Sequence, residues 1–199
     1  AMIFNNKHVG KISDGKNHYG YFARKDPAGR AEYFEDSAEM IDLLYNVTSL
    51  ALWTPFNEAW GQFDTEEVVK FTRALDPTRL INYASGGNFE RCSGDILDLH
   101  NYPHPEMYLY DPAYINVLGE YGGIGLPLEG HLWQPDRNWG YIQYKNGDDV
   151  LDAYERYAEE LIDLVQKGFA AAVYTQTTDV EGEVNGLMTY DRKVIKVDA

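Results

Sequence analysis

The sequence predicts an α/β protein in which strands alternate with helices. Five short apolar runs have the length of strands, and polar or glycine-rich residues follow each of them. Segments with apolar residues at helical spacing separate several of these runs. Such alternation is typical of parallel strands joined by right-handed crossovers. We therefore expect one mostly parallel sheet in a chain of 199 residues, a length that suits a single domain.

The helical segments carry signals for their ends. Residues 1–33 show no hydrophobic period and many glycine and proline breaks, so we expect a long loop there. Helices are predicted over residues 34–46, 64–75 and 148–167. Asp64 and Glu67 have the spacing of a capping box at the start of the second helix. Lys167-Gly168 ends the third helix, as the helix dipole and glycine capping predict.

Strands occupy the apolar runs between and after these helices. They are predicted over residues 49–56, 79–84, 96–100, 115–119 and 169–175. Only about ten residues join the second strand to the third, fewer than a usual parallel crossover needs, so this connection should be nearly helix-free. Ile124–Gly147 is predicted as a long aromatic loop, and the tail from Gln176 as turns.

Composition narrows the range of partners. The net charge of −15 argues against nucleic acid or an anionic membrane as a partner. The single cysteine, Cys92, excludes an internal disulfide and cysteine-based metal clusters, and we interpret it as an inert thiol. No apolar run is long enough to span a bilayer, and no signal peptide is recognisable. We expect a cytoplasmic protein without a cofactor or a metal.

A polar pair, Asn57-Glu58, follows the first predicted strand and lies between Trp53 and Trp60. Indole faces pack on the CH groups of sugars, and apolar surroundings raise the pKa of a carboxyl group. This combination predicts a carbohydrate site at the end of the strand. The alternative is that Glu58 is an exposed loop residue with no function.

All five predicted strands end in polar or glycine-rich residues. These are Asn57-Glu58, Ser85-Gly86, His100-Asn101-Tyr102, Glu120 and Thr175-Gln176. Polar residues at the carboxyl ends of the strands are typical of a (β/α)-barrel active site. In a barrel, Glu58 and Glu120 would face each other across the mouth. Glycoside hydrolysis needs such a pair, with one carboxyl group protonated and the other ionised.

Two motifs resemble those of glycoside hydrolase family 2, the β-galactosidase and β-glucuronidase group. Trp53–Gln62 resembles the acid/base motif of that family, and Leu118–Gly123 resembles its nucleophile motif. Tyr174–Glu181 and Asn185–Arg192 resemble the end of the barrel in a bacterial subgroup. The resemblance covers residues 17–196. It implies a TIM barrel domain that hydrolyses β-glycosidic bonds of a carbohydrate substrate with retention.

The resemblance assigns roles to individual positions. Glu58 would be the general acid/base and Glu120 the nucleophile, with their carboxyl groups about 5–5.5 Å apart. Asn57 would hydrogen-bond the sugar 2-hydroxyl, and Tyr102 would hold Glu120 in orientation. The other candidates for substrate contact are His100, Trp60, His131, Trp133 and Gln176. Trp53 is either a sugar platform or a core residue.

A looser set of polar residues has two interpretations. Asp98, His100, His104 and Glu106 could be metal ligands, or they could be loop groups beside a sugar site. We prefer the second interpretation, because metal-ligand spacing this loose is common by chance.

The number of strands limits the functional prediction. A closed barrel needs eight strands, and the five predicted here would correspond to the fourth through eighth strands of the family barrel. We expect an incomplete (β/α)8 TIM barrel as one domain over residues 1–199, with 1–33 as a covering segment and 34–199 as barrel units. Truncation could abolish activity, and exposed sheet edges could pair in a homodimer. A non-catalytic carbohydrate-binding pseudoenzyme and an inactive gene remnant remain alternatives, and the sugar is not specified.

Overall fold

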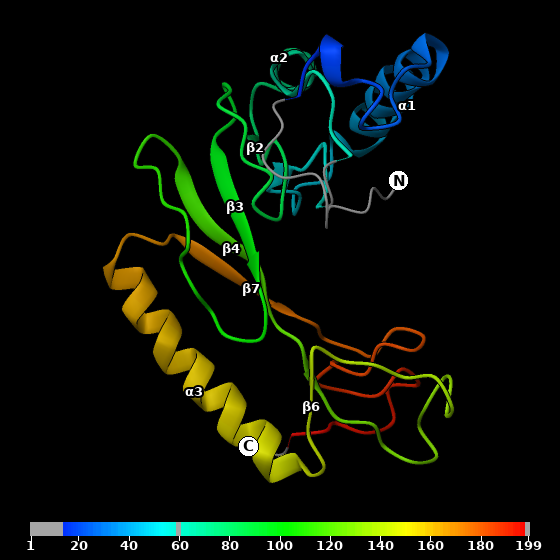
Figure 1. Cartoon of the computed structure of the whole chain (residues 1–199), viewed down its shortest axis with the longest axis vertical. Helices are drawn as coiled ribbons and strands as arrows, with labels where there is room; N and C mark the ends of the chain where they lie inside the picture. The colour runs from blue at the N-terminus through cyan, green and yellow to red at the C-terminus, as the bar shows by residue number, and fades with distance from the viewer. Residues whose placement is uncertain (1–13, 59–60, 198–199) are drawn as a thin grey trace. The chain divides into compact units, whose positions relative to one another are not determined.

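The computed structural model describes residues 14–58 and 61–197 (Figure 1). They form a mixed α/β structure that groups into two compact units. Unit 1 contains the residues up to Asp98 together with Leu109–Asn116. Unit 2 contains Leu99–Tyr108 and the residues from Val117 onwards. Each unit is described by itself.

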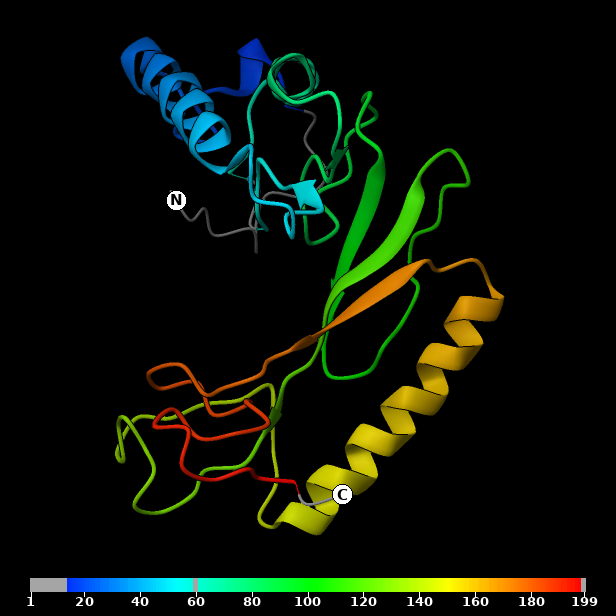
Figure 2. The same cartoon turned by 180° about the vertical axis from the view of Figure 1, so that it is seen from behind.

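Unit 1 is built from helices packed around a pair of short parallel strands. Its elements are η2 (Lys16–His18), α1 (Pro27–Leu44), β1 (Leu52–Trp53), α2 (Thr65–Leu75) and β2 (Leu80–Ile81). Helices α1 and α2 contact each other, and both are visible from behind in Figure 2. β1 pairs with β2 in parallel, with Trp53 opposite Ile81. A parallel bridge between Asn82 and Ile96 continues the pairing to the next strand.

Helix α1 begins earlier than the sequence pattern predicts. It starts at Pro27, and the Asp26 side chain accepts a hydrogen bond from Ala28 N at 3.0 Å. Proline at the first helical position after an aspartate cap is a recognised start signal. The prediction of a loop over residues 1–33 is therefore wrong for Pro27 onwards. Residues 1–13 lie outside the described part of the chain.

The start of α2 also differs from its prediction. Asp64 has a left-handed backbone, with φ of 43°, and its side chain makes no capping hydrogen bond. The cap comes instead from Asp14, whose Oδ2 accepts from Thr65 N at 2.8 Å and also from the Thr65 hydroxyl. The predicted capping box is wrong because the capping carboxylate comes from a distant part of the chain.

The core of unit 1 is largely aromatic and aliphatic. Phe56, Phe63, Val69 and Ile81 are buried in one cluster. The ring of Tyr33 stacks on Phe56, with centroids 5.3 Å apart and an interplanar angle of 11°. This packing fixes the segment that leaves β1, and that segment carries Asn57 and Glu58.

Unit 2 contains the longer strands and the longest helix. Its elements are the second half of β3 (Ile96–Asn101), most of β4 (Ile115–Gly122), β5 (Ile124–Gly125), β6 (Ile142–Gln143), α3 (Gly147–Gln166) and β7 (Ala171–Thr175). The strand order is β3-β4-β7, and β4 and β7 are parallel (Figure 1). β5 and β6 form a second parallel pair. The predicted loop over Ile124–Gly147 therefore contains two short strands.

The predicted parallel order is confirmed where strand pairs are described. β2 connects to β3 without a helix, as the short crossover predicts. Helix α3 is followed by Gly168, with φ of 103°, so the predicted glycine end is confirmed. Within residues 14–58 and 61–197 the strands form three separate sheets and no closed barrel. The correspondence of these strands to the fourth through eighth strands of a barrel remains a prediction.

Candidate active site

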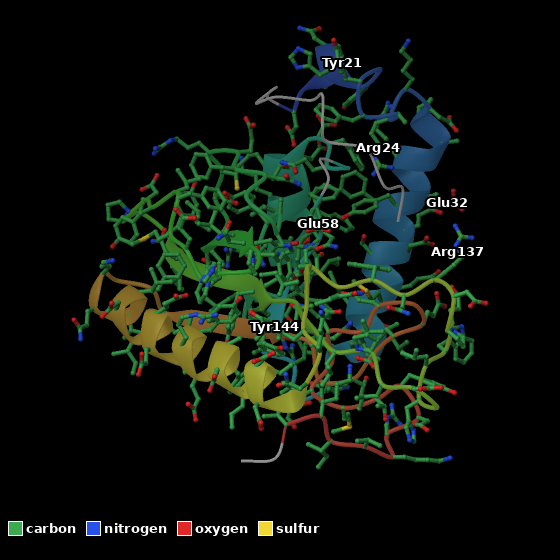
Figure 3. The ribbon with its side chains drawn as sticks, turned by 60° about the horizontal axis from the view of Figure 1, so that its bottom comes forward. Tyr21, Arg24, Glu32, Glu58, Arg137 and Tyr144 are labelled. Atoms are coloured by element: carbon green, nitrogen blue, oxygen red, sulfur yellow. The ribbon has the colours of Figure 1, made fainter. Side chains whose placement is uncertain are left out.

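In unit 1, the segment after β1 carries Asn57 and Glu58, and both side chains are exposed. Asn57 Oδ1 accepts a hydrogen bond from Ser85 Oγ at 2.5 Å. Ser85 N also donates to the carbonyl of Phe56 at 3.0 Å. These bonds join the segments that follow β1 and β2, two of the predicted polar strand ends. Glu58 is labelled in Figure 3.

Two tryptophans flank this segment in the sequence. The Trp53 side chain is 4% exposed, and its indole Nε1 donates to Asp76 Oδ2 at 2.9 Å. Trp53 is therefore a core residue, and its interpretation as a sugar platform is wrong. Trp60 lies outside the described residues.

In unit 2, Glu120 lies inside strand β4 and not after it. The register with β7 changes between Leu118, which faces Ala172, and Tyr121, which faces Tyr174. Strand β4 therefore has one more residue than β7 over this interval, and Glu120 lies within it. Bulges of this kind redirect side chains and are common beside active sites. The predicted strand end at Gly119 is wrong, because pairing continues to Gly122.

One carboxylate oxygen of Glu120 has two polar neighbours. The Tyr102 hydroxyl donates to Glu120 Oε2 at 2.7 Å, and His100 Nδ1 lies 3.2 Å from the same oxygen. The Glu120 side chain is 30% exposed, whereas that of His100 is 7% exposed. The carboxylate is thus held on one side and accessible on the other.

Tyr102 is kept in its neutral, donating form. Burial raises the pKa of its phenol above the ordinary value, and the hydrogen bond to Glu120 raises that pKa further. The Thr175 side chain is also hydrogen-bonded to Tyr102. Residues from β3, β4 and β7 therefore form one polar cluster, which we call the Glu120 cluster: His100, Tyr102, Glu120 and Thr175.

Gln176 follows Thr175 at the carboxyl end of β7. Its backbone N donates to the carbonyl of Asn185 at 3.3 Å, and its carbonyl accepts from Leu187 N at 3.0 Å. Its side-chain Nε2 is buried, and no acceptor contacts it among the residues that the structure describes.

A comparison with protein families gives a match over most of the chain. The family model described as "Glycosyl hydrolases family 2, TIM barrel domain" matches residues 5–195. The chain belongs to glycosyl hydrolase family 2. Its membership confirms the predicted family and indicates a glycosidase-like function at the level of the family. A search of curated proteins found no match.

The aromatic segment of this family 2 domain carries two further candidates. His131 Nδ1 lies 2.9 Å from Asp191 Oδ2. Hydrogen bonding by Thr189, and then by His131, lowers the pKa of Asp191 to about 2. Trp133 is 57% exposed and packs edge-on against Tyr190, with centroids 5.6 Å apart. Both candidates thus have defined neighbours within unit 2.

Two residues of the metal interpretation, Asp98 and His104, have partners within the protein. Asp98 accepts a hydrogen bond from Asn82 Nδ2 at 2.6 Å, and His104 Nδ1 lies 3.2 Å from Glu160 Oε2.

Burial raises the pKa of the Cys92 thiol to about 11, so little reactive thiolate is present near neutral pH. None of the helices in the described residues is long and apolar enough to cross a membrane.

Some neighbours of the Glu120 cluster were not found from the sequence. Tyr141, whose ring stacks on Tyr102, was not predicted as a site residue. Thr175, a member of the cluster, was predicted only as a strand end. The pair Gly122-Gly123, two residues after Glu120, was a usable signal. Consecutive glycines beside a candidate catalytic residue indicate that other side chains approach the backbone closely.

Proposed function

We propose that this family 2 domain hydrolyses β-glycosidic bonds with retention, with Glu120 as the nucleophile and Glu58 as the general acid/base. The observation that carries the proposal is the environment of Glu120. Its Oε2 receives a hydrogen bond from Tyr102 at 2.7 Å and lies 3.2 Å from His100 Nδ1. Hydrogen bonds to a carboxylate fix its direction, which a nucleophile needs.

In the first step, a Glu120 carboxylate oxygen attacks the anomeric carbon of the sugar. The bond between that carbon and the leaving-group oxygen breaks as Glu58 donates its proton to this oxygen. The products are a glycosyl ester on Glu120 and the free alcohol. The Tyr102 hydroxyl keeps the attacking carboxylate in place, since its raised pKa keeps it protonated.

In the second step, the ionised Glu58 takes a proton from water as the water oxygen attacks the anomeric carbon. The ester bond to Glu120 breaks, which restores the carboxylate and releases the sugar with its original configuration. This mechanism requires carboxyl groups about 5–5.5 Å apart.

Several polar and aromatic groups are proposed to bind the sugar. Gln176, directly after Thr175 of the Glu120 cluster, is proposed as one contact to a sugar hydroxyl. Asn57, whose Oδ1 is already held by Ser85, would contact the 2-hydroxyl. His131 and the exposed ring of Trp133 are proposed as outer contacts. Apolar sugar faces pack well on such a ring.

The test is hydrolysis of aryl β-galactosides, β-glucuronides and related β-glycosides by the wild type and two variants. Glu120→Gln should lower kcat by roughly 10⁴-fold or more, because it removes the nucleophile. Glu58→Gln should lower kcat by about 10²–10⁴-fold, because it removes the proton donor. Glu129→Gln and Glu39→Gln, which change exposed glutamates in units 2 and 1, are the matched controls.

A further arm separates the two glutamate roles. In Glu58→Ala, added azide should restore turnover of a substrate with a good leaving group and give the β-glycosyl azide, because azide needs no general base. Glu120→Ala should not give this product. Unchanged rates in both glutamine variants would contradict the assignment. Sugar binding by calorimetry without any hydrolysis would instead favour the carbohydrate-binding alternative.

A further inference from the structure

We propose that Tyr141 is a positioning residue for Glu120, which it holds indirectly by fixing the ring of Tyr102. The inference rests on the proposed role of Glu120 as the nucleophile. The rings of Tyr102 and Tyr141 are stacked, with centroids 3.7 Å apart and an interplanar angle of 6°. The hydroxyl of the same Tyr102 donates to Glu120 Oε2 at 2.7 Å. Tyr141 thus contacts the side chain that contacts the carboxylate.

Backbone hydrogen bonds hold Tyr141 near the end of β4, the strand that carries Glu120. β5 and β6 pair in parallel, with Ile124 opposite Ile142. Ile142 N donates to the carbonyl of Gly123 at 3.2 Å, and Gly123 N donates to the carbonyl of Thr175 at 3.0 Å. Ile142, the residue after Tyr141, is therefore hydrogen-bonded to Gly123, three positions after Glu120. Gly123 is in turn hydrogen-bonded to Thr175 at the end of β7.

Gly123 makes room for the two stacked rings. A Cβ at this position would lie 2.5 Å from Tyr141 Cδ2 and 2.9 Å from Tyr102 Cδ1. Its φ of +64° is also one that other residues rarely adopt. The close approach of both rings to this backbone indicates that the glycine is required for the stack.

The stack controls the direction of the hydrogen bond to Glu120. A tyrosine ring turns about its first two side-chain torsions, and its hydroxyl lies at the far end from the backbone, so small rotations displace it strongly. Contact with Tyr141 on one face limits these rotations. Without that contact, Tyr102 would hold the carboxylate less firmly, and a misplaced reacting group reduces the rate strongly.

Packing in the core does not account for the position of Tyr141. Its side chain is 43% exposed, and Trp139 packs against it edge-on, with centroids 5.5 Å apart. Truncation of an exposed ring costs little stability. An effect of this truncation on catalysis would therefore reflect the position of Tyr102.

The kinetic test compares Tyr141→Ala with Tyr141→Phe, which keeps the stacking ring. Tyr110→Ala removes a ring of similar exposure, 45%, in unit 1 and serves as the control. We expect kcat of Tyr141→Ala to fall about tenfold, equivalent to 1.4 kcal/mol, with little change in KM. Tyr141→Phe should retain most of the wild-type kcat. An unchanged kcat in Tyr141→Ala, a change in KM alone, or equal losses in both variants would overturn the proposal.

A second measurement needs no turnover. In protein labelled with 3-fluorotyrosine, the ¹⁹F resonance of Tyr102 is assigned by its absence in Tyr102→Phe. Glu120→Gln should shift this resonance, because the hydrogen-bond partner loses its charge. In the Tyr141→Ala background, the same substitution should cause a clearly smaller shift, and an equal shift would overturn the proposal. The ¹⁹F comparison measures only the contact between Tyr102 and Glu120. The proposed function is tested separately, because hydrolysis rates unaffected by Glu120→Gln would contradict it.

Discussion

Glu120 and Tyr102 form the contact on which the proposed chemistry depends at the scale of single residues. The glutamate motif and the position of Tyr102 at a strand end could both be recognised in the sequence. The family resemblance also implied that Tyr102 holds Glu120 in orientation, and the hydrogen bond of 2.7 Å between them agrees with this prediction. The irregular register between Leu118 and Tyr121 could not be recognised. Residue types and strand ends are local properties, whereas the direction of a side chain depends on pairing with a strand far along the chain.

Removal of one hydroxyl group tests this contact. Tyr102→Phe keeps the ring stacked on Tyr141 but removes the donor to Glu120. A hydrogen bond to a charged group contributes about 1.5–3 kcal/mol, so kcat/KM for aryl β-glycosides should fall roughly 10–100-fold. The circular dichroism spectrum should be unchanged. Wild-type kinetics in this variant would show that Tyr102 does not act on Glu120.

Trp53 shows that an aromatic residue beside a catalytic motif can belong to the core. Its indole N–H donates to the buried carboxylate of Asp76 at 2.9 Å. Trp53→Phe should destabilise the protein by about 1–3 kcal/mol, because it leaves a buried acceptor with one donor fewer. Urea unfolding measures this loss. Weaker sugar binding at unchanged stability would contradict its assignment to the core.

At the scale of elements, Asp76 joins the end of α2 to both strands of unit 1. Its carboxylate accepts from Trp53 on β1 and from Thr78 and Arg79, which precede β2. Burial opposes its ionisation, but hydrogen bonds from Thr78, Trp53 and Arg79 outweigh burial and lower the pKa well below 3.8. The sequence showed Asp76-Pro77 only as a helix end, because the donors to this carboxylate come from separate elements.

This carboxylate makes stability depend on pH in one direction. The pKa of Asp76 is lower in the folded state than in the unfolded state, where it is near 3.8. Its contribution to the free energy of unfolding is therefore complete above pH 3.8 and is lost as the pH falls below that value. Asp76→Asn should therefore lower the urea midpoint at pH 7, and its difference from the wild type should narrow towards pH 3. Asp42→Asn, an exposed substitution on α1, is the control. A constant difference from pH 7 to pH 3 would contradict this role.

A buried ion pair joins the C-terminal segments of unit 2. Lys196 Nζ lies 2.6 Å from Asp179 Oδ1, and the two side chains are 1% and 3% exposed. Lys196→Met should cost about 3–5 kcal/mol, because it leaves a buried carboxylate without its partner. Asp179→Leu added to Lys196→Met should recover part of this loss in urea unfolding. Additive losses in the double variant would show that the pair is not coupled.

At the scale of the whole molecule, the sequence predicted the class of fold better than its boundaries. Hydrophobic periodicity found α2, α3 and the parallel strand order, because these depend on repeated local patterns. It missed the start of α1 at Pro27 and the short pair β5–β6. Two-residue strands carry no measurable period, and their pairing is set by the packing around Gly123 and Gly125.

Other statements about the whole chain stay predictions. They include one catalytic domain over residues 1–199, a cytoplasmic location, a homodimer through sheet edges, and β-galactosidase-like specificity. Membership of glycosyl hydrolase family 2 indicates a glycosidase-like function and does not specify the sugar.

Covalent trapping tests the proposed role of Glu120 most directly. The protein is incubated with 2,4-dinitrophenyl 2-deoxy-2-fluoro-β-glycosides. The fluorine slows both formation and hydrolysis of the glycosyl ester, whereas the dinitrophenolate leaving group speeds formation alone, so the ester accumulates. Peptide mass spectrometry then locates the added sugar. We predict one glycosyl group on Glu120 in the wild type and in Glu129→Gln, and none in Glu120→Gln. A label on another residue, or no label with glycosides that the protein binds, would contradict the assignment of Glu120 as the nucleophile.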